Sequence, residues 1–139
     1  MSVEIRPMQT EDYSAAHSLW KSLPGMGLSS ADQFENIKKF LEKNADTCFV
    51  AEENNQLVGT VLGGNDGRRG YIYHLAVHTD HQKKGIGKQL TETCLVALRK
   101  QGIMKCHIFV ISDNEDGIQF WKKIGWEMRD DILVMSRNL

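Results

Sequence analysis

The clearest pattern of apolar and polar positions in the chain lies between residues 71 and 101. Apolar and aromatic residues dominate residues 71–77, which predicts a β-strand. Apolar residues then recur at helical spacing, which predicts a helix whose apolar face carries Ile86, Leu90, Cys94, Ala97 and Leu98. The residues between the two patterns are mostly polar or glycine. A strand, a turn and a helix are therefore expected to follow one another directly.

The chain before residue 47 predicts a short strand and two helices. Residues 3–7 alternate weakly and end in proline, which favours a strand. Thr10 suits the N-cap of a helix that ends at the proline and glycine of residues 24–25. Ser30 and Gln33 fit a capping box that starts a second helix. The two helices and their apolar connection form the part of the chain most like a lid.

The next stretch predicts a β-hairpin. Residues 47–53 are expected to form a strand, Asn54 and Asn55 a turn, and residues 56–62 the partner strand. Residues 63–70 are rich in glycine and are expected to form a long connection to the strand at residues 71–77.

The end of the chain predicts a strand, a helix and two closing strands. Residues 106–112 are apolar enough for a strand. Residues 113–114 precede a helical pattern that ends at Gly125, a residue type that often follows a helix. Short apolar runs at residues 126–128 and 132–135 favour two more strands.

The order of these elements indicates an α/β (α+β) fold with a mixed sheet and helices on both faces. The tight turns imply antiparallel pairing, whereas the long helix implies that the strand at 106–112 runs parallel to the strand at 71–77. With no repeat, linker or low-complexity segment, residues 1–139 are expected to form a single domain.

Composition and charge narrow the class of protein. A net charge of −1 argues against general attraction to nucleic acid or to an anionic membrane. No apolar run approaches the ~20 residues of a membrane span, and the first residues do not resemble a signal peptide. Cys48, Cys94 and Cys106 lie within apolar patterns, so we interpret them as small buried residues, with a catalytic cysteine as the alternative. We therefore expect a cytoplasmic protein.

The turn at residues 82–87 is the strongest candidate for a binding site. Two glycines precede or begin a helix there, and the first backbone N–H groups of a helix have no partner within the helix. The helix dipole adds partial positive charge at the same place, and Lys83 and Lys84 add more. Together these features predict a site for phosphate.

Two common phosphate-binding motifs fit this turn poorly. A P-loop requires an early glycine and a serine or threonine after Gly-Lys, where this chain has Gln82 and Gln89. A dinucleotide-binding loop requires a third glycine, where this chain has Leu90.

A third pattern fits better. The spacing Gln-x-x-Gly-x-Gly formed by Gln82, Gly85 and Gly87 after a strand resembles the acyl-CoA-binding signature of the GNAT superfamily of N-acetyltransferases. Residues 113–127 resemble the second half of that pattern, with an asparagine turn, a helix and a glycine-aromatic exit. A tight turn without a ligand is the alternative. The resemblance implies a GNAT-like, largely antiparallel sheet of about six to seven strands, flanked by about four helices, with two splayed parallel central strands.

The resemblance also implies where acetyl-CoA, the co-substrate, would bind. The backbone of Leu75, Ala76 and Val77 would pair with the pantetheine arm, as an added strand would. The cofactor's pyrophosphate would bind the turn and the helix start, formed by Gln82, Lys83, Lys84, Gly85, Ile86, Gly87 and Lys88. The alternative for the three lysines is an ordinary solvated surface.

In the GNAT superfamily the thioester lies where the two parallel strands splay, and an unpaired backbone N–H there stabilises the oxyanion. Asn114 would contact the arm from the far side of the splay, with a helix N-cap as the alternative role. Trp121 stands where many members of the superfamily have a tyrosine that acts as general acid. An indole N–H donates hydrogen bonds but does not release its proton, so Trp121 is expected to pack on the arm or in the core.

Proton transfer has two candidates, His74 and Tyr73. A histidine has an unperturbed pKa of about 6.5, which suits removal of a proton from an ammonium group. By strand alternation, His74 would share a face with Ile72 and Ala76, and Tyr73 would lie on the opposite face. A structural histidine is the alternative for His74. A zinc site formed by His74, His78 and His81 is not expected, because strand residues four apart are separated by about 13 Å, too far for one zinc shell.

The sequence thus predicts an acetyl-CoA-dependent N-acetyltransferase that acts on a primary amine of a small molecule or a protein by direct attack. A non-catalytic acyl-CoA sensor or interaction module is the alternative. No metal, nucleic acid or membrane partner is expected. The resemblance leaves a homodimer open, since dimers are common in the superfamily. Glu52, Glu53 and the connections at residues 24–30 and 63–70 are candidates for the wall of the acceptor pocket.

Overall fold

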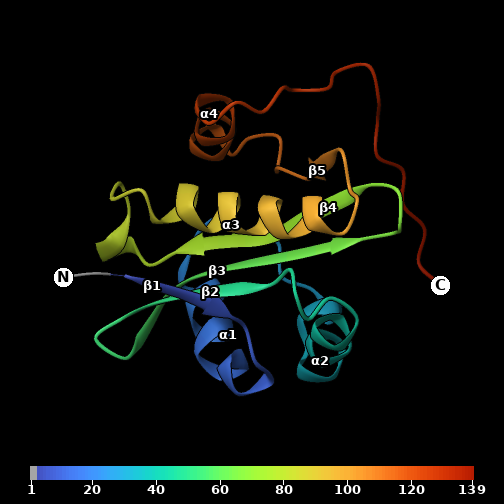
Figure 1. Ribbon diagram of the computed structural model, residues 1–139. Coiled ribbons are helices and arrows are strands. Elements are labelled where there is room, and N and C mark those ends of the chain that lie inside the picture. The colour runs from blue at the N-terminus through green and yellow to red at the C-terminus, as the bar shows by residue number, and fades with distance from the viewer. Residues whose placement is uncertain (1–2) are drawn as a thin grey trace. The chain divides into compact units, whose positions relative to one another are not determined.

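The computed structural model describes residues 3–139, which fall into two compact parts, one ending at Phe109 and one running from Val110 to Leu139. The first part contains strands β1 to β5 and helices α1 to α3, and the second part contains α4 (Figure 1). The bounds are β1 Glu4–Pro7, α1 Tyr13–Ser22, α2 Phe34–Lys43, β2 Phe49–Glu53, β3 Gln56–Asn65, β4 Gly70–Val77, α3 Ile86–Lys100, β5 Cys106–Ile108 and α4 Glu115–Lys123. That residues 1–139 form a single domain stays a prediction.

The strands form one five-stranded sheet in the order β1-β2-β3-β4-β5. Neighbouring strands are antiparallel except for β4 and β5, which are parallel, with Gly70 opposite Cys106 and Ile72 opposite Ile108. The mixed sheet and its one parallel pair therefore agree with the sequence. The number of strands is lower than the six to seven expected, and β5 lies at the edge of the sheet instead of at its centre.

Helices cover both faces of this sheet. Figure 1 shows α1 and α2 on one face and α3 on the other. Trp20 and Leu41 of the two helices pack with Val50 and Leu62 of the sheet in one core cluster. On the opposite face, α3 buries Leu90 together with Ile86, Thr91, Cys94 and Leu98, so the face predicted from sequence is the buried one, apart from the half-buried Ala97.

The predicted hairpin between β2 and β3 is confirmed. Asn54 and Asn55 have φ angles of 53° and 63°, and both central residues of a type I′ turn require positive φ. Asparagine tolerates this conformation better than most residues, which explains the sequence found at the turn.

The glycine-rich connection predicted at residues 63–70 is wrong, because its first residues belong to β3. A Cβ atom at Gly63 would lie 2.3 Å from the Sγ of Cys94 and 2.6 Å from the carbonyl oxygen of Thr47. Glycine is therefore required there by the close approach of α3 and of the chain just before β2, not by a turn. The connection itself is limited to residues 66–69.

Two predicted helix starts are displaced. Thr10 begins a 3-10 helix, Thr10–Asp12, with Gln9 as its N-cap, and α1 follows directly. The capping box lies at Ser29 and Asp32, one residue before the predicted Ser30 and Gln33. In both cases a 3-10 turn precedes the α-helix, which moves the cap toward the N-terminus.

The end of the chain contains fewer strands than predicted. The strand expected at residues 106–112 stops at Ile108, and residues 126–128 and 132–135 form no strand. A short apolar run is ambiguous, since a strand forms only where a neighbouring strand pairs with it. The predicted helix is confirmed as α4, and Gly125 follows its end.

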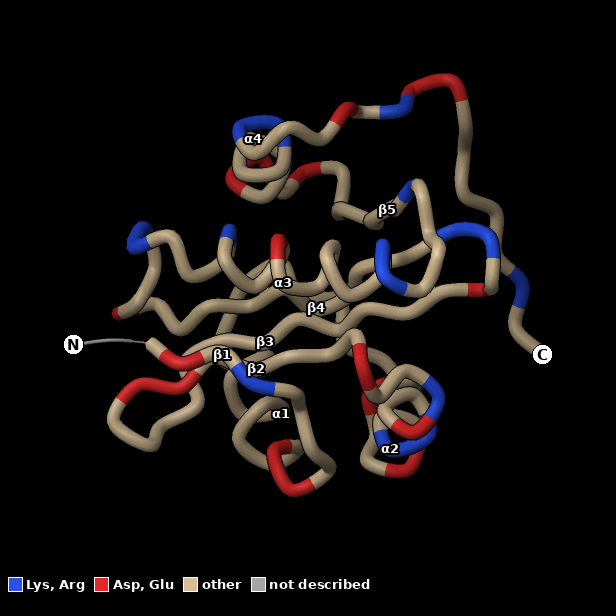
Figure 2. The backbone as a smooth tube through the Cα atoms, in the orientation of Figure 1, with Lys and Arg blue, Asp and Glu red and all other residues tan. Residues whose placement is uncertain are grey.

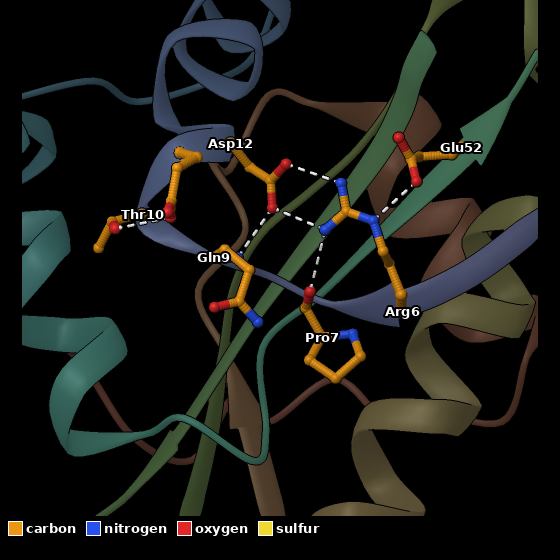
Figure 3. A network of polar contacts seen from close by, with 7 residues as sticks. Arg6, Pro7, Gln9, Thr10, Asp12 and Glu52 are labelled. Carbon is orange, nitrogen blue, oxygen red and sulfur yellow. Dashed lines mark hydrogen bonds and ion pairs between the residues drawn. The ribbon is translucent and has the colours of Figure 1, made fainter. Parts of the chain in front are cut away.

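A network of charged side chains joins the first two strands to the start of α1 (Figure 3). The guanidinium of Arg6 donates to both carboxylate oxygens of Asp12 at 2.8 and 2.9 Å and to Glu52 at 2.7 Å. Arg6 is on β1, Glu52 is on β2 and Asp12 directly precedes α1, so one side chain connects three elements.

No helix within residues 3–139 is both long enough and apolar enough to cross a lipid bilayer.

Candidate active site

The turn between β4 and α3 presents a series of backbone donors without acceptors. Within residues 3–139, no backbone N–H from residue 83 to residue 88 donates a hydrogen bond, and the first one that does is Gln89, to the carbonyl of Gly85 at 3.0 Å. Lys83 and Gly85 have φ angles of 63° and 84°, and this left-handed geometry turns the chain into the helix. Such a turn can hold an anion through main-chain N–H groups.

Positive side chains surround the same turn. Lys83, Lys84 and Lys88 are exposed, and Figure 2 shows blue segments where the chain leads into α3. The side-chain amide of Gln82 donates to the carbonyl of Val77 at 3.0 Å, which ties the turn back to the end of β4. The residues that sequence analysis assigned to the cofactor's pyrophosphate therefore lie together at one helix start.

The second half of β4 has one open edge within residues 3–109. β5 pairs with β4 only from Gly70 to Ile72, so the edge of β4 that follows has no strand beside it in this part of the chain. Leu75, Ala76 and Val77 lie on this stretch, with Ala76 buried and the other two half-buried. Unpaired strand edges can accept an extended ligand through main-chain hydrogen bonds.

A β-bulge in β4 reorients His74. Leu62 pairs with Tyr73 and Thr60 with Ala76, so two residues of β4 face one residue of β3. His74 has a φ of 48° at this position, and its carbonyl accepts a hydrogen bond from the Thr60 hydroxyl at 2.8 Å. His74 shares a face with Ala76 as predicted, since its ring lies against Trp20 of the core cluster that contains Ala76. Tyr73 packs against the same cluster, so its predicted place on the opposite face is wrong.

The ring of His74 lies on the face covered by α1 and α2. Its centroid is 4.6 Å from that of Trp20, and its Nε2 lies 2.6 Å from Oδ1 of Asp32. Asp32 is in the connection between the two helices, and its side chain is 8% exposed. Asp32 could not be predicted from sequence as a partner of His74, because the two residues are 42 positions apart.

Tyr73 belongs to an aromatic cluster. Its ring stacks on Tyr71 and meets Phe40 and Phe109 at centroid distances of 6.4, 6.0 and 6.3 Å. Burial raises the pKa of the Tyr73 hydroxyl, with smaller contributions from Tyr71 and Cys106. The phenol therefore keeps its proton at neutral pH and can donate a hydrogen bond, but it is a poor base.

The acidic residues predicted beside the acceptor have partners. Glu52 binds Arg6, and an oxygen of Glu53 lies 3.5 Å from Nε2 of His81. Residues 3–139 contain no group of three histidine, cysteine or acidic side chains placed to hold a metal ion.

In the part from Val110 to Leu139, Asn114 is the N-cap of α4. Its side chain accepts a hydrogen bond from the N–H of Gly117 at 3.0 Å. The ring of Trp121 packs against Phe120 and Trp126, at centroid distances of 5.2 and 4.9 Å. Their predicted contacts with the cofactor stay predictions.

Known proteins resemble this chain over almost its whole length. The acetyltransferase (GNAT) family matches residues 10–126. An acetyltransferase of Pectobacterium atrosepticum is 33% identical over 97% of this chain and 95% of its own length. One from Sodalis glossinidius is 30% identical over 99% of this chain and 96% of its own.

Solved structures show the same fold. The PaiA N-acetyltransferase of Thermoplasma acidophilum, solved with coenzyme A, superposes with a TM-score of 0.79 at 23% identity, covering 94% of this chain and 92% of its own. The family match and the sequence relatives agree with the anion-binding turn and the open strand edge described above. The chain belongs to the GNAT family of acetyltransferases, which transfer an acetyl group from acetyl-CoA to an amine.

Proposed function

We propose that this enzyme acetylates a primary amine of a small molecule or a protein by direct attack on acetyl-CoA, with His74 as general base. The observation that carries the proposal is an imidazole on the strand that also has the open edge, a few residues before the anion-binding turn. A base next to the thioester is what amine acetylation requires, because an amine is mostly protonated at neutral pH and an ammonium group has no lone pair for attack.

The cofactor is proposed to bind in two segments. The N–H groups of residues 83–88 would hold the pyrophosphate, with Lys83, Lys84 and Lys88 adding positive charge. The pantetheine arm would extend along the open edge of β4 and pair with the backbone of Leu75, Ala76 and Val77. This arrangement is supported by the donors without acceptors and by the early end of β5.

The proposed reaction begins with the loss of a proton from the acceptor's ammonium group. The ammonium group gives one proton to His74, and the nitrogen lone pair attacks the thioester carbonyl to form a carbon–nitrogen bond. A backbone N–H on the open edge of β4 would stabilise the oxyanion. The tetrahedral intermediate loses a second proton from nitrogen to solvent and breaks the carbon–sulfur bond, which releases CoA as thiolate or, after protonation by solvent, as thiol. A free thiol has a pKa of about 8.5, so a strong acid is not essential for this step.

A covalent cysteine intermediate has little support. Burial raises the pKa of Cys48 to about 12 and that of Cys106 to about 11, and it raises the pKa of Cys94 as well. The thiolate, which is the nucleophilic form, is therefore scarce at all three positions at neutral pH. Direct transfer needs none of these thiols.

Tyr73 is proposed as a donor toward the leaving sulfur, since its raised pKa keeps the phenol protonated. Glu52 and Glu53 are not proposed as a site for a cationic acceptor, because Arg6 and His81 already lie against them.

The three cysteines form no disulfide, which supports a reducing compartment such as the cytoplasm. A homodimer is proposed only from its frequency in the family.

The proposal is tested by measuring CoA release from acetyl-CoA with a panel of amines that includes polyamines, aminoglycosides and peptides with free N-termini. We expect at least one amine to raise CoA release at least about tenfold above hydrolysis, with formation of the acetylated amine by mass spectrometry. Tight acetyl-CoA binding without amine-dependent release across the panel would favour an acyl-CoA sensor instead.

A further inference from the structure

The two nitrogens of the His74 ring have different surroundings. Nε2 lies 2.6 Å from Oδ1 of Asp32, and the two side chains are 14% and 8% exposed. Among residues 3–139, Nδ1 of His81 is the one buried side-chain nitrogen or oxygen without a hydrogen-bond partner. Nδ1 of His74 also has no hydrogen bond, and because it is not one of these fully buried atoms, part of its surface is accessible to solvent.

This asymmetry fixes the protonation pattern of the neutral ring. An ionised carboxylate only accepts hydrogen bonds, so Nε2 must carry the hydrogen that it directs at Asp32. A neutral imidazole has one N–H, and Nδ1 therefore holds the lone pair. The nitrogen able to take a proton is the accessible one.

Asp32 is itself held by groups other than His74. Its Oδ2 accepts a hydrogen bond from the N–H of Ser29 at 2.9 Å, and its carbonyl accepts one from the Tyr13 hydroxyl at 2.7 Å. The carboxylate is thus fixed in the connection between α1 and α2. It can hold the His74 ring in one orientation without losing its own.

The opposite side of the ring is also fixed. Trp20 lies against it, and the indole N–H of Trp20 donates to the Thr60 hydroxyl at 2.9 Å. That hydroxyl in turn donates to the His74 carbonyl. Ring, backbone and carboxylate therefore form one connected, largely buried unit with a single open nitrogen.

From this geometry we infer that Asp32 is a positioning residue for His74, and that it orients Nδ1 toward the acceptor amine and stabilises the imidazolium formed when His74 takes the amine's proton. The inference rests on the proposed function. In this step the ammonium N–H bond breaks, the Nδ1–H bond forms, and the positive charge moves from the amine to the ring beside the Asp32 carboxylate. The proton later leaves Nδ1 for solvent, which restores the base.

Few other titratable groups face this ring within residues 3–109. Asp32, in the connection before α2, contacts the ring, and Tyr73 precedes His74 in β4. From α1, His17 lies against Trp20 at 6.3 Å, and the hydroxyl of Tyr13 donates to the carbonyl of Asp32. A change in pH dependence on removing Asp32 can therefore be assigned to the Asp32–His74 contact.

The test compares Asp32→Asn, His74→Gln and the double variant, with Ser29→Ala as matched control. Ser29→Ala removes the hydroxyl that accepts from the Ala31 N–H in the same turn but leaves the Asp32 carboxylate in place. We expect Asp32→Asn to lower kcat by about 10- to 100-fold with the KM for acetyl-CoA within about threefold. The double variant should lose no more than His74→Gln alone, because Asp32 acts through His74.

The pH profile provides a second readout. If Asp32 acts on proton transfer through His74 and not through packing alone, the pH profile of kcat should differ between Asp32→Asn and wild type. Restoring a carboxylate with Asp32→Glu should recover part of the activity. Losses that multiply in the double variant, or a loss in Ser29→Ala equal to that in Asp32→Asn, would overturn the inference.

Failure of the proposed function looks different. If His74→Gln keeps wild-type kcat, the base is assigned wrongly. If acetyl-CoA titration shows no binding to the wild-type protein, the cofactor site is wrong. A measurement on the wild-type protein covers the case in which Asp32→Asn does not fold: ¹⁵N NMR of labelled histidine should show the Nε2–H tautomer for neutral His74. The Nδ1–H tautomer, or rapid exchange between the two, would contradict the inference.

Discussion

At the scale of single residues, His74 illustrates how local strain and function coincide. Its φ of 48° costs a residue with a Cβ about 1 kcal/mol or more, and it persists because Thr60 and Asp32 hold the backbone and the ring. Bulges often re-aim a side chain next to an active site. The bulge here moves the imidazole toward α1 and α2.

Replacing His74 tests its role directly. We predict that His74→Gln lowers kcat by about 100-fold or more, because the proton must then pass to water without a positioned base. Acetyl-CoA affinity, measured by calorimetry, should change less than about threefold, since the ring lies on the helix-covered face and not at the turn that holds the phosphates.

The matched control is His17→Gln, which removes a histidine from the same aromatic group without touching Asp32. Its kcat should stay within about threefold of wild type. Equal losses in the two variants would indicate a packing defect instead of a missing base.

The sequence identified His74 as a candidate but could not identify Asp32. Strand pattern and residue type are local signals, and they are sufficient to place a histidine on β4. The contact with Asp32 depends on how the connection before α2 folds over the sheet, and a single sequence contains no signal for that. The bulge is equally hidden, because nothing in residues 71–77 departs from a regular strand.

At the scale of elements, the close approach of α3 to β3 determines which residues the sheet can contain. Gly63 is within a strand, where glycine normally weakens pairing, yet a side chain there would collide with Cys94 and with the backbone at Thr47. The helix that begins at the anion-binding turn is packed on the sheet through this contact.

We predict that Gly63→Ala lowers the free energy of unfolding by about 2–3 kcal/mol, because the added methyl group overpacks a rigid contact. Urea denaturation followed by circular dichroism measures it. Adding Cys94→Ala removes the sulfur but not the Thr47 carbonyl, so it should restore part of the loss and not all of it. A change below about 0.5 kcal/mol would show that the interface is looser than the structure indicates.

Most elements could be predicted from local patterns, and the errors share one cause. The hairpin turn, α3 and α4 each have a strong local signal, either helical spacing or paired asparagines. The misassigned residues 63–65, 110–112 and 132–135 are short runs whose state depends on which neighbour lies beside them. Non-local pairing decides those cases.

At the scale of the whole molecule, the Arg6 network joins the first two strands of the sheet to the start of α1. Burial alone would raise the pKa of Asp12, but the hydrogen bonds from Arg6 and from the N–H of Gln9, together with the charge of Arg6, outweigh it and lower that pKa. A carboxylate whose pKa is lower in the folded than in the unfolded state stabilises the fold at pH values above its unfolded-state pKa of about 3.9. That stabilisation is lost as the pH falls through the folded value.

We therefore predict that Asp12→Asn destabilises the protein at neutral pH. The difference in stability between this variant and wild type should shrink as the pH falls below about 4. Thermal melts from pH 7 to pH 3 measure this difference. The control is Glu11→Gln, whose carboxylate accepts from the Thr10 hydroxyl instead of from Arg6. A difference in melting temperature between wild type and Asp12→Asn that stays constant from pH 7 to pH 3 would argue against the role of the ion pair.

The central claim is that main-chain N–H groups at the start of α3 hold the pyrophosphate of the cofactor. Calorimetric titration of CoA and of pantetheine into wild type, Gly87→Asp and Val96→Asp tests it most directly. Val96 is on the same helix and is 43% exposed, so Val96→Asp adds the same charge to α3 away from the turn.

We predict that Gly87→Asp weakens CoA binding by at least about 100-fold, because a carboxylate beside a phosphate costs several kcal/mol. Pantetheine, which lacks the pyrophosphate, should bind wild type and Gly87→Asp about equally, and Val96→Asp should bind CoA as wild type does. If Gly87→Asp binds CoA within about threefold of wild type, the pyrophosphate is held elsewhere and the proposed site is wrong.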